Sequence, residues 1–421
     1  MLTSFRQPLL NAAPALLLFF LLLAHVTALR SISLVIAAVT AIYVWRKEGC
    51  PPIPLKLPLL VWAGMALASL AWAKDRSYSF SEIRVEIGYC VGYFLVFFVL
   101  TRNRQCWNLF RAALLAGLAV MTAVAVRLYT LNHDLHADSY LGGVLTTSTL
   151  LVTVFPILLA ATYEFRREVA LLALNSIAIA AALAVGYLTF IRNFILSIDA
   201  IVLTVAAMLV GRHASSKRRL AVFALVGILA VGGSLAFLLS VAKHRSGTQS
   251  IDATVQTTID RDPRWSIWEF SLDLIRERPL TGVGFGRFAA VDLYRKNFPD
   301  EIFYSHAHNP FLNYAVQMGV GGVAALSFLL FALLREFWRL WKSGLPQVAY
   351  IGLTGIAMLV GVLVKTQTDD LWTRQQGYLF WALTGMMLGY AHRLQSAAPT
   401  PTNPTADKSH TATTGRARSR G

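Results

Sequence analysis

The sequence predicts an all-α integral membrane protein with about 12 transmembrane helices and a long periplasmic loop that contains amphipathic helices. Of its 421 residues, 56% are hydrophobic and only 14% are charged, whereas soluble domains carry roughly a quarter charged residues. Apolar runs approaching the roughly 20 residues of a bilayer crossing recur along most of the chain. Three cysteines (Cys50, Cys90 and Cys106) are too few for a disulfide framework or a four-cysteine zinc site. These observations exclude a soluble enzyme.

The apolar runs divide the chain into four parts. Residues 1–241 hold the first nine predicted helices, 242–310 form the long loop, 311–394 hold the last three helices, and 395–421 are rich in Pro, Thr and Ser, which predicts a disordered cytoplasmic tail. The predicted helices are 9–25, 31–45, 57–73, 87–101, 107–128, 141–163, 168–190, 193–210, 219–241, 311–334, 347–366 and 377–394. As one helix, 168–210 would span about 60 Å, twice the hydrocarbon core, so we expect a tight turn at Arg192 and Asn193.

The positive charges indicate the orientation of the chain. With the amino terminus in the cytoplasm, 21 lysines and arginines fall on the cytoplasmic side and 8 on the short outer loops. This asymmetry obeys the positive-inside rule and predicts that both termini are cytoplasmic. The other 9 lie in the long outer loop, where they would attract an anionic molecule. The net charge of +16 therefore reflects topology and anionic lipid rather than nucleic acid.

The long outer loop begins with a predicted amphipathic helix. Asp262 is a favoured N-cap, Pro263 suits the first helical position, and Pro279 ends a helix of about 15 residues. We expect its apolar stripe to rest on the membrane face. That stripe consists of Trp265, Trp268, Leu272 and Ile275.

Glycines and a histidine follow this helix. The segment PLTGVGFGRF matches neither common phosphate-loop motif, so its glycines are interpreted as sharp turns beside helix ends. At the end of the loop, Asn309 can cap a helix that Pro310 begins, which leaves His308 just outside it at the membrane surface. Gly319, Gly321 and Gly322 are expected to permit close helix packing.

These residues resemble the bacterial O-antigen ligases, within the O-antigen ligase and polymerase superfamily. His308-Asn309, nine residues, Gly319, two residues and Gly322 fit the pattern H-[NSQ]-x9-G-x-x-[GTY] of that family. The stretch from Arg264 to PLTGVGFGRF resembles the superfamily core, and Arg192 lies where the family keeps an arginine. The R-x3-L signature is met only approximately, because Trp268 stands at the leucine position.

The resemblance implies an inner-membrane glycosyltransferase. It would transfer O-polysaccharide from undecaprenyl pyrophosphate to a sugar hydroxyl of lipid A-core on the periplasmic face, without metal, cofactor or nucleic acid. Arginine suits the pyrophosphate because its planar fork bonds two oxygens and stays charged, which makes Arg192 and Arg264 the candidates. Histidine titrates near neutral pH, so His308 is the candidate general base. Residues that could support the site are Asn309, Trp268, Asp369 and Asp370.

Other interpretations stay open. A polymerase would use a second lipid-linked glycan as acceptor, a protein-glycosylating relative a pilin serine, and a transporter would need a polar path through the bundle. His306 and His308 could bind zinc, although no third ligand is visible nearby in the sequence. A loop with His133, Asp134, His136 and Asp138 could bind a divalent ion but is interpreted as solvated. Asp369 and Asp370 could orient acceptor sugars or pair with Lys365 or Arg374.

Overall fold

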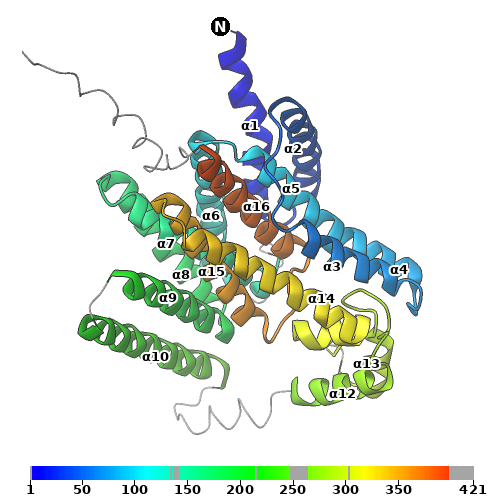
Figure 1. The fold of residues 1–421 in the computed structure, drawn as a ribbon. Coiled ribbons are helices and arrows are strands. Elements are labelled where there is room, and N and C mark those ends of the chain that lie inside the picture. The colour runs from blue at the N-terminus through cyan, green and yellow to red at the C-terminus, as the bar shows by residue number, and fades with distance from the viewer. Residues whose placement is uncertain are drawn as a thin grey trace, which may run out of the picture.

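The computed structural model describes residues 2–132, 135, 142–213, 216–246, 264–301 and 304–397, which contain helices and no strand. Figure 1 shows the bundle, with α12 and α13 at the end opposite the start of α1. The α-helices are α1 (Leu2–Leu21), α2 (Thr27–Glu48), α3 (Lys56–Ser69), α4 (Arg76–Glu82), α5 (Tyr89–Leu100), α6 (Arg104–Asn132), α7 (Val144–Glu164), α8 (Val169–Leu188), α9 (Arg192–His213), α10 (Ser216–Ser246), α12 (Arg264–Glu277), α13 (Val291–Asn297), α14 (Pro310–Trp341), α15 (Pro346–Thr366) and α16 (Arg374–Ala397). A π-helix, η1 (Ile83–Gly88), joins α4 to α5.

The predicted all-α membrane fold is confirmed, and each of the twelve apolar runs coincides with a helix. Within the described ranges, 8 helices are long and apolar enough to cross a membrane. With 14 residues, α3 is shorter than the roughly 20 that a crossing needs. Twelve crossings therefore remain a prediction.

Two helix boundaries differ from the expected ones. The run 168–210 does break, but α8 ends at Leu188 and α9 begins at Arg192, so the turn precedes Arg192. The helix expected at 87–101 begins eleven residues earlier, at Arg76. The charged residues of its first turns are typical of a loop. However, the Asp75 carboxylate accepts a hydrogen bond from the backbone N–H of Tyr78 at 2.9 Å and caps the helix.

The centre of the bundle is formed by α5, α7, α15 and α16, whose side chains are mostly buried. The helices α5 and α16 approach one another closely. A Cβ atom on Gly385 would lie 2.2 Å from the Phe94 carbonyl oxygen, and one on Gly389 would lie 2.3 Å from that of Phe98. Only glycine permits this separation, as is common between membrane helices.

The glycine-rich segment 279–287 packs on a kink in α14. Gly319 adopts φ 64° and ψ −159° within that helix, which removes the hydrogen bonds of the preceding carbonyls. The carbonyl oxygens of Val316 and Gln317 instead accept hydrogen bonds from the backbone N–H groups of Val283 (3.0 Å) and Gly284 (2.9 Å). A Cβ atom on Gly319 would lie 2.5 Å from the Pro279 carbonyl oxygen. We expected Gly319 to bring two transmembrane helices together. Instead, it lets the glycine-rich segment pack on α14.

The predicted amphipathic helix is α12, but its buried face is shifted. Ile267, Ser271 and Leu274 are buried, whereas Trp265 and Leu272 of the expected stripe are exposed. The buried face packs on α13 and the start of α14 rather than lying wholly on a membrane. Residues 247–263 of the long loop, the tail beyond 397 and the candidate ion ligands His133, Asp134, His136 and Asp138 lie outside the described residues.

Candidate functional site

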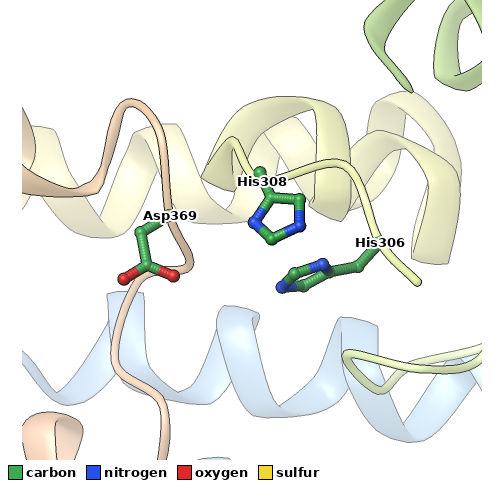
Figure 2. A group of neighbouring side chains, drawn as sticks. All are labelled: His306, His308 and Asp369. Carbon is green, nitrogen blue, oxygen red and sulfur yellow. The ribbon is translucent and has the colours of Figure 1, made fainter. Parts of the chain in front are cut away.

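Two histidines lie in the short segment that enters α14. His306 is 2% exposed, and its ring centroid lies 3.8 Å from that of the half-buried His308, with 69° between the ring planes. His308 has φ 47°, in the left-handed region, so the chain turns sharply there. Figure 2 shows the two rings beside one another, with Asp369 approaching from the loop after α15.

Asn309 and Trp268 hold this segment in place. The Asn309 side-chain oxygen accepts hydrogen bonds from the first N–H groups of α14, at 3.0 and 3.2 Å, which confirms the predicted cap. Its amide nitrogen donates to the Gln367 carbonyl oxygen at 3.2 Å. The indole N–H of Trp268 donates to the Ala307 carbonyl oxygen at 3.0 Å, so α12 fixes the backbone between the two histidines.

Asp370 is the most connected side chain of the site and is only 4% exposed. Its Oδ2 lies 2.9 Å from Nε2 of His306 and forms an ion pair with Nε of Arg287. Its Oδ1 accepts a hydrogen bond from the amide of Asn313 in α14 at 2.9 Å. A single buried carboxylate thus joins the histidine segment, the glycine-rich segment and α14.

Asp369 lies between two cations. Its carboxylate oxygens are 3.8 Å from Nη2 of Arg287 and 4.0 Å from Nζ of Lys365, which is 1% exposed. The expected pair with Lys365 is therefore found. Arg374, the other partner considered, lies 3.6 Å from Glu82 instead.

The environment of His308 favours its neutral form. Burial is the main cause that lowers the pKa of His308 to about 3, and the neighbouring His306 lowers it further. Arg264 and Arg287 act in the same direction, while Asp370 opposes them. At neutral pH the imidazole is therefore unprotonated and has a lone pair available to accept a proton.

The environment of Asp370 favours its charged form. Burial acts to raise the pKa of Asp370, but the hydrogen-bonded His306 and the Arg287 guanidinium outweigh it and hold the pKa below its usual value. An ionised carboxylate attracts the Arg287 guanidinium and the His306 ring and holds both beside it.

From the sequence we expected no third metal ligand near His306 and His308. The structure places Asp369 there, so this expectation is wrong. Ligand atoms of His306, His308 and Asp369 all lie within 4.8 Å of one another, so Asp369 would complete a three-residue set. However, Asp369 already faces the cations of Arg287 and Lys365. These positive charges oppose a metal ion and favour an anion at the same place.

The two predicted pyrophosphate ligands, Arg264 and Arg192, lie at different parts of the site. Arg264 begins α12, and its charge acts directly on His308. Arg192 begins α9, and its neighbour Asn193 donates a side-chain hydrogen bond to Thr368. Arg192 therefore lies beside the loop that carries Asp369.

Sequence reasoning missed two cations of the site. Arg287 follows the last glycine of PLTGVGFGRF, where only the glycines attracted attention. Lys365 was considered only as an ion-pair partner, although a lysine inside an apolar helix is itself a functional signal. Arg287 pairs with both Asp369 and Asp370, and Lys365 pairs with Asp369.

Comparison with known proteins gives one family. The family model described as O-antigen ligase matches residues 140–327. This range contains Arg192, Arg264 and His308 and ends before the loop that carries Asp369 and Asp370. No curated protein matches the chain.

Proposed function

The chain belongs to the O-antigen ligase and polymerase superfamily, and from this premise we propose that it is an O-antigen ligase of the bacterial inner membrane. The reaction is the transfer of O-polysaccharide from undecaprenyl pyrophosphate to a sugar hydroxyl of lipid A-core. We place the active site on the periplasmic side and both termini in the cytoplasm, as the distribution of lysine and arginine favours.

One observation carries the proposal: a neutral imidazole, His308, lies within the electrostatic reach of the Arg264 guanidinium. Glycosyl transfer from a pyrophosphate needs a base for the acceptor hydroxyl and positive charge for the leaving group. It needs no acid for that leaving group, because a pyrophosphate departs as an anion. A neutral base and a cation that acts on it electrostatically could supply both requirements.

The proposed step forms one bond and breaks one. The acceptor hydroxyl oxygen attacks C1 of the first donor sugar, and its proton passes to His308. The bond between C1 and the pyrophosphate oxygen breaks, and undecaprenyl pyrophosphate leaves with the bonding electrons. Arg264 and Arg192 bind the charge that develops on the leaving group.

His306, Asp370 and Trp268 act as positioning residues. Asp370 orients His306 at 2.9 Å, and the His306 ring packs on His308 with 3.8 Å between centroids. Trp268 holds the carbonyl between them. Together they limit the rotation of the base, so that its lone pair faces the acceptor.

The test is reconstitution with defined substrates. Purified full-length protein in detergent is incubated with undecaprenyl-pyrophosphate glycan and rough lipopolysaccharide, without metal or nucleotide. We expect a ladder of capped lipopolysaccharide on a gel. Longer lipid-linked glycan formed without lipopolysaccharide would identify a polymerase, and the absence of both products would refute glycosyl transfer.

A further inference from the structure

A cavity with a volume of 450 Å³ adjoins the site and is not used by the proposed mechanism. The end of α4, the π-helix η1, the start of α7 and the loop after α15 surround it. Arg287 and Asp369 belong both to its wall and to the cluster of ion pairs described above. His308, Arg264 and Arg192 do not line it. The volume is within the range of about 300–1,000 Å³ found for small-molecule sites.

The lining combines acids, bases and neutral polar groups. Three carboxylates (Glu82, Glu86 and Asp369) face two guanidinium groups (Arg287 and Arg374). Threonine hydroxyls and glutamine amides complete the polar lining; they belong to Thr146, Thr373, Gln375 and Gln376. A phosphate site requires an excess of cationic donors, which this cavity lacks. Its chemistry fits an uncharged group that both donates and accepts hydrogen bonds, which is the property of a sugar hydroxyl.

The ion pairs along the wall leave hydrogen-bonding capacity for such a ligand. Arg374 lies 3.6 Å from Glu82, and Arg287 lies 3.8 Å from Asp369. Both distances exceed a normal hydrogen bond. A hydroxyl placed between the partners of either pair could accept from the guanidinium and donate to the carboxylate.

Local structure holds the lining groups in place. The π-helix follows directly after Glu82 and contains Glu86, and π-helical turns occur preferentially at functional sites. The Tyr78 hydroxyl accepts a hydrogen bond from the backbone N–H of Phe288 at 2.9 Å, which fixes Arg287 against α4. The Phe288 ring is 41% exposed and offers an apolar face at the rim, as sugar rings require on one side.

We infer that this cavity binds the acceptor sugar whose hydroxyl is the nucleophile, with Glu82, Glu86 and Arg287 as its principal ligands. This inference rests on the proposed function. Asp369 connects the two sites, because its carboxylate lies within 4.8 Å of ring nitrogens of His306 and His308. A sugar hydroxyl bound at Asp369 is therefore beside the base.

The test separates sugar binding from transfer. The probe is core oligosaccharide released from rough lipopolysaccharide, and its binding to the purified full-length protein is measured by calorimetry. Transfer kinetics then give KM for lipopolysaccharide and for the lipid-linked donor separately. Glu82→Gln removes one charged acceptor from the cavity wall and should weaken oligosaccharide binding and raise the acceptor KM by about ten- to a hundredfold, with the donor KM unchanged.

Two further variants keep the test decisive. Leu145→Trp fills the cavity from an exposed position at its wall and should abolish oligosaccharide binding without removing a charge. Glu269→Gln makes the same chemical change as Glu82→Gln at an exposed site on α12 and should alter neither KM.

The outcomes distinguish the two proposals. Normal oligosaccharide binding and acceptor KM in both Glu82→Gln and Leu145→Trp would overturn the sugar site and leave the ligase proposal intact. Oligosaccharide binding that these variants abolish, in a protein without transfer activity, would support the sugar site and refute the ligase. A rise in the donor KM alone would also overturn the assignment to the acceptor.

Discussion

Replacement of Asp370 by asparagine tests the connections of the site most severely. The substitution keeps the size of the side chain and the oxygen that accepts from Asn313 at 2.9 Å. It replaces the oxygen that faces His306 at 2.9 Å and Arg287 by an N–H donor or, after rotation of the amide, by a neutral oxygen. Of the two carboxylates that pair with Arg287, Asp369 then still offsets its positive charge, at 3.8 Å.

The magnitude follows from the contacts that are lost. Removing one partner of a buried ion pair costs about 3–5 kcal/mol, and the substitution removes the charge that faces both Arg287 and His306. Asp369 still offsets part of the Arg287 charge, so we expect the lower end, a loss of about 3 kcal/mol in the free energy of unfolding. Because His306 packs on His308, transfer should also fall, while the donor still binds.

Unfolding of the purified protein in mixed detergent micelles measures the first effect, and turnover with saturating donor measures the second. Asp292→Asn is the matched control. Asp292 also pairs with a cation, Lys74 at 3.2 Å, but its side chain is 72% exposed, and an exposed pair contributes about 0–1 kcal/mol. If Asp370→Asn were as stable and as active as this control, the role of Asp370 in orienting the site would be refuted.

Four further predictions concern the base, the cations and metal. His308→Ala should lower transfer by about 10²- to 10⁴-fold with donor binding retained in a lipid-binding assay; loss of donor binding would contradict its role as base. Arg192→Lys and Arg264→Lys should each lose most activity although insertion and yield stay normal, because lysine cannot form two parallel bonds to a phosphate; near wild-type transfer by both would contradict the pyrophosphate assignment. Since burial lowers the pKa of His308 to about 3, the unfolded chain takes up a proton near pH 6.5 that the folded protein refuses, so stability falls as the pH decreases from 6.5 toward 3. Unfolding at several pH values should show a smaller fall for His308→Gln, and equal slopes would contradict the shift. Treatment with a chelator should leave transfer unchanged, and activity lost to a chelator and restored by zinc would contradict an anion site.

The helices were predictable because their signal is local. About 20 consecutive apolar residues have few alternatives to a membrane helix, and the Asn309 cap with Pro310 marks the start of α14 within two residues. The start of the helix at Arg76 was not predictable in this way. Its exposed polar turns show no hydrophobic periodicity, and the Asp75 cap is the one local signal of the start of this helix.

The candidate site was only partly predictable because its contacts join distant segments. His308, Arg264 and Asp370 were identified from motif and residue type, but nothing in their spacing states that Asp370 lies on His306. The spacing gives no sign of the kink at Gly319 either, which frees two carbonyls of α14 for the N–H groups of Val283 and Gly284.

The kink at Gly319 also explains why the role of Arg287 was not predicted from the sequence. Arg287 reaches the two carboxylates only because the glycine-rich segment is seated on α14. The glycines of PLTGVGFGRF therefore serve the site indirectly: Gly282 at φ 62° has no room for a Cβ atom, which would lie 2.5 Å from the Gln317 carbonyl. A side chain at Gly282 should displace the segment and, with it, Arg287, although neither glycine nor kink touches a substrate. The glycines of this segment can thus be essential, although they offer no side chain to a ligand, because they position the arginine that follows the last of them.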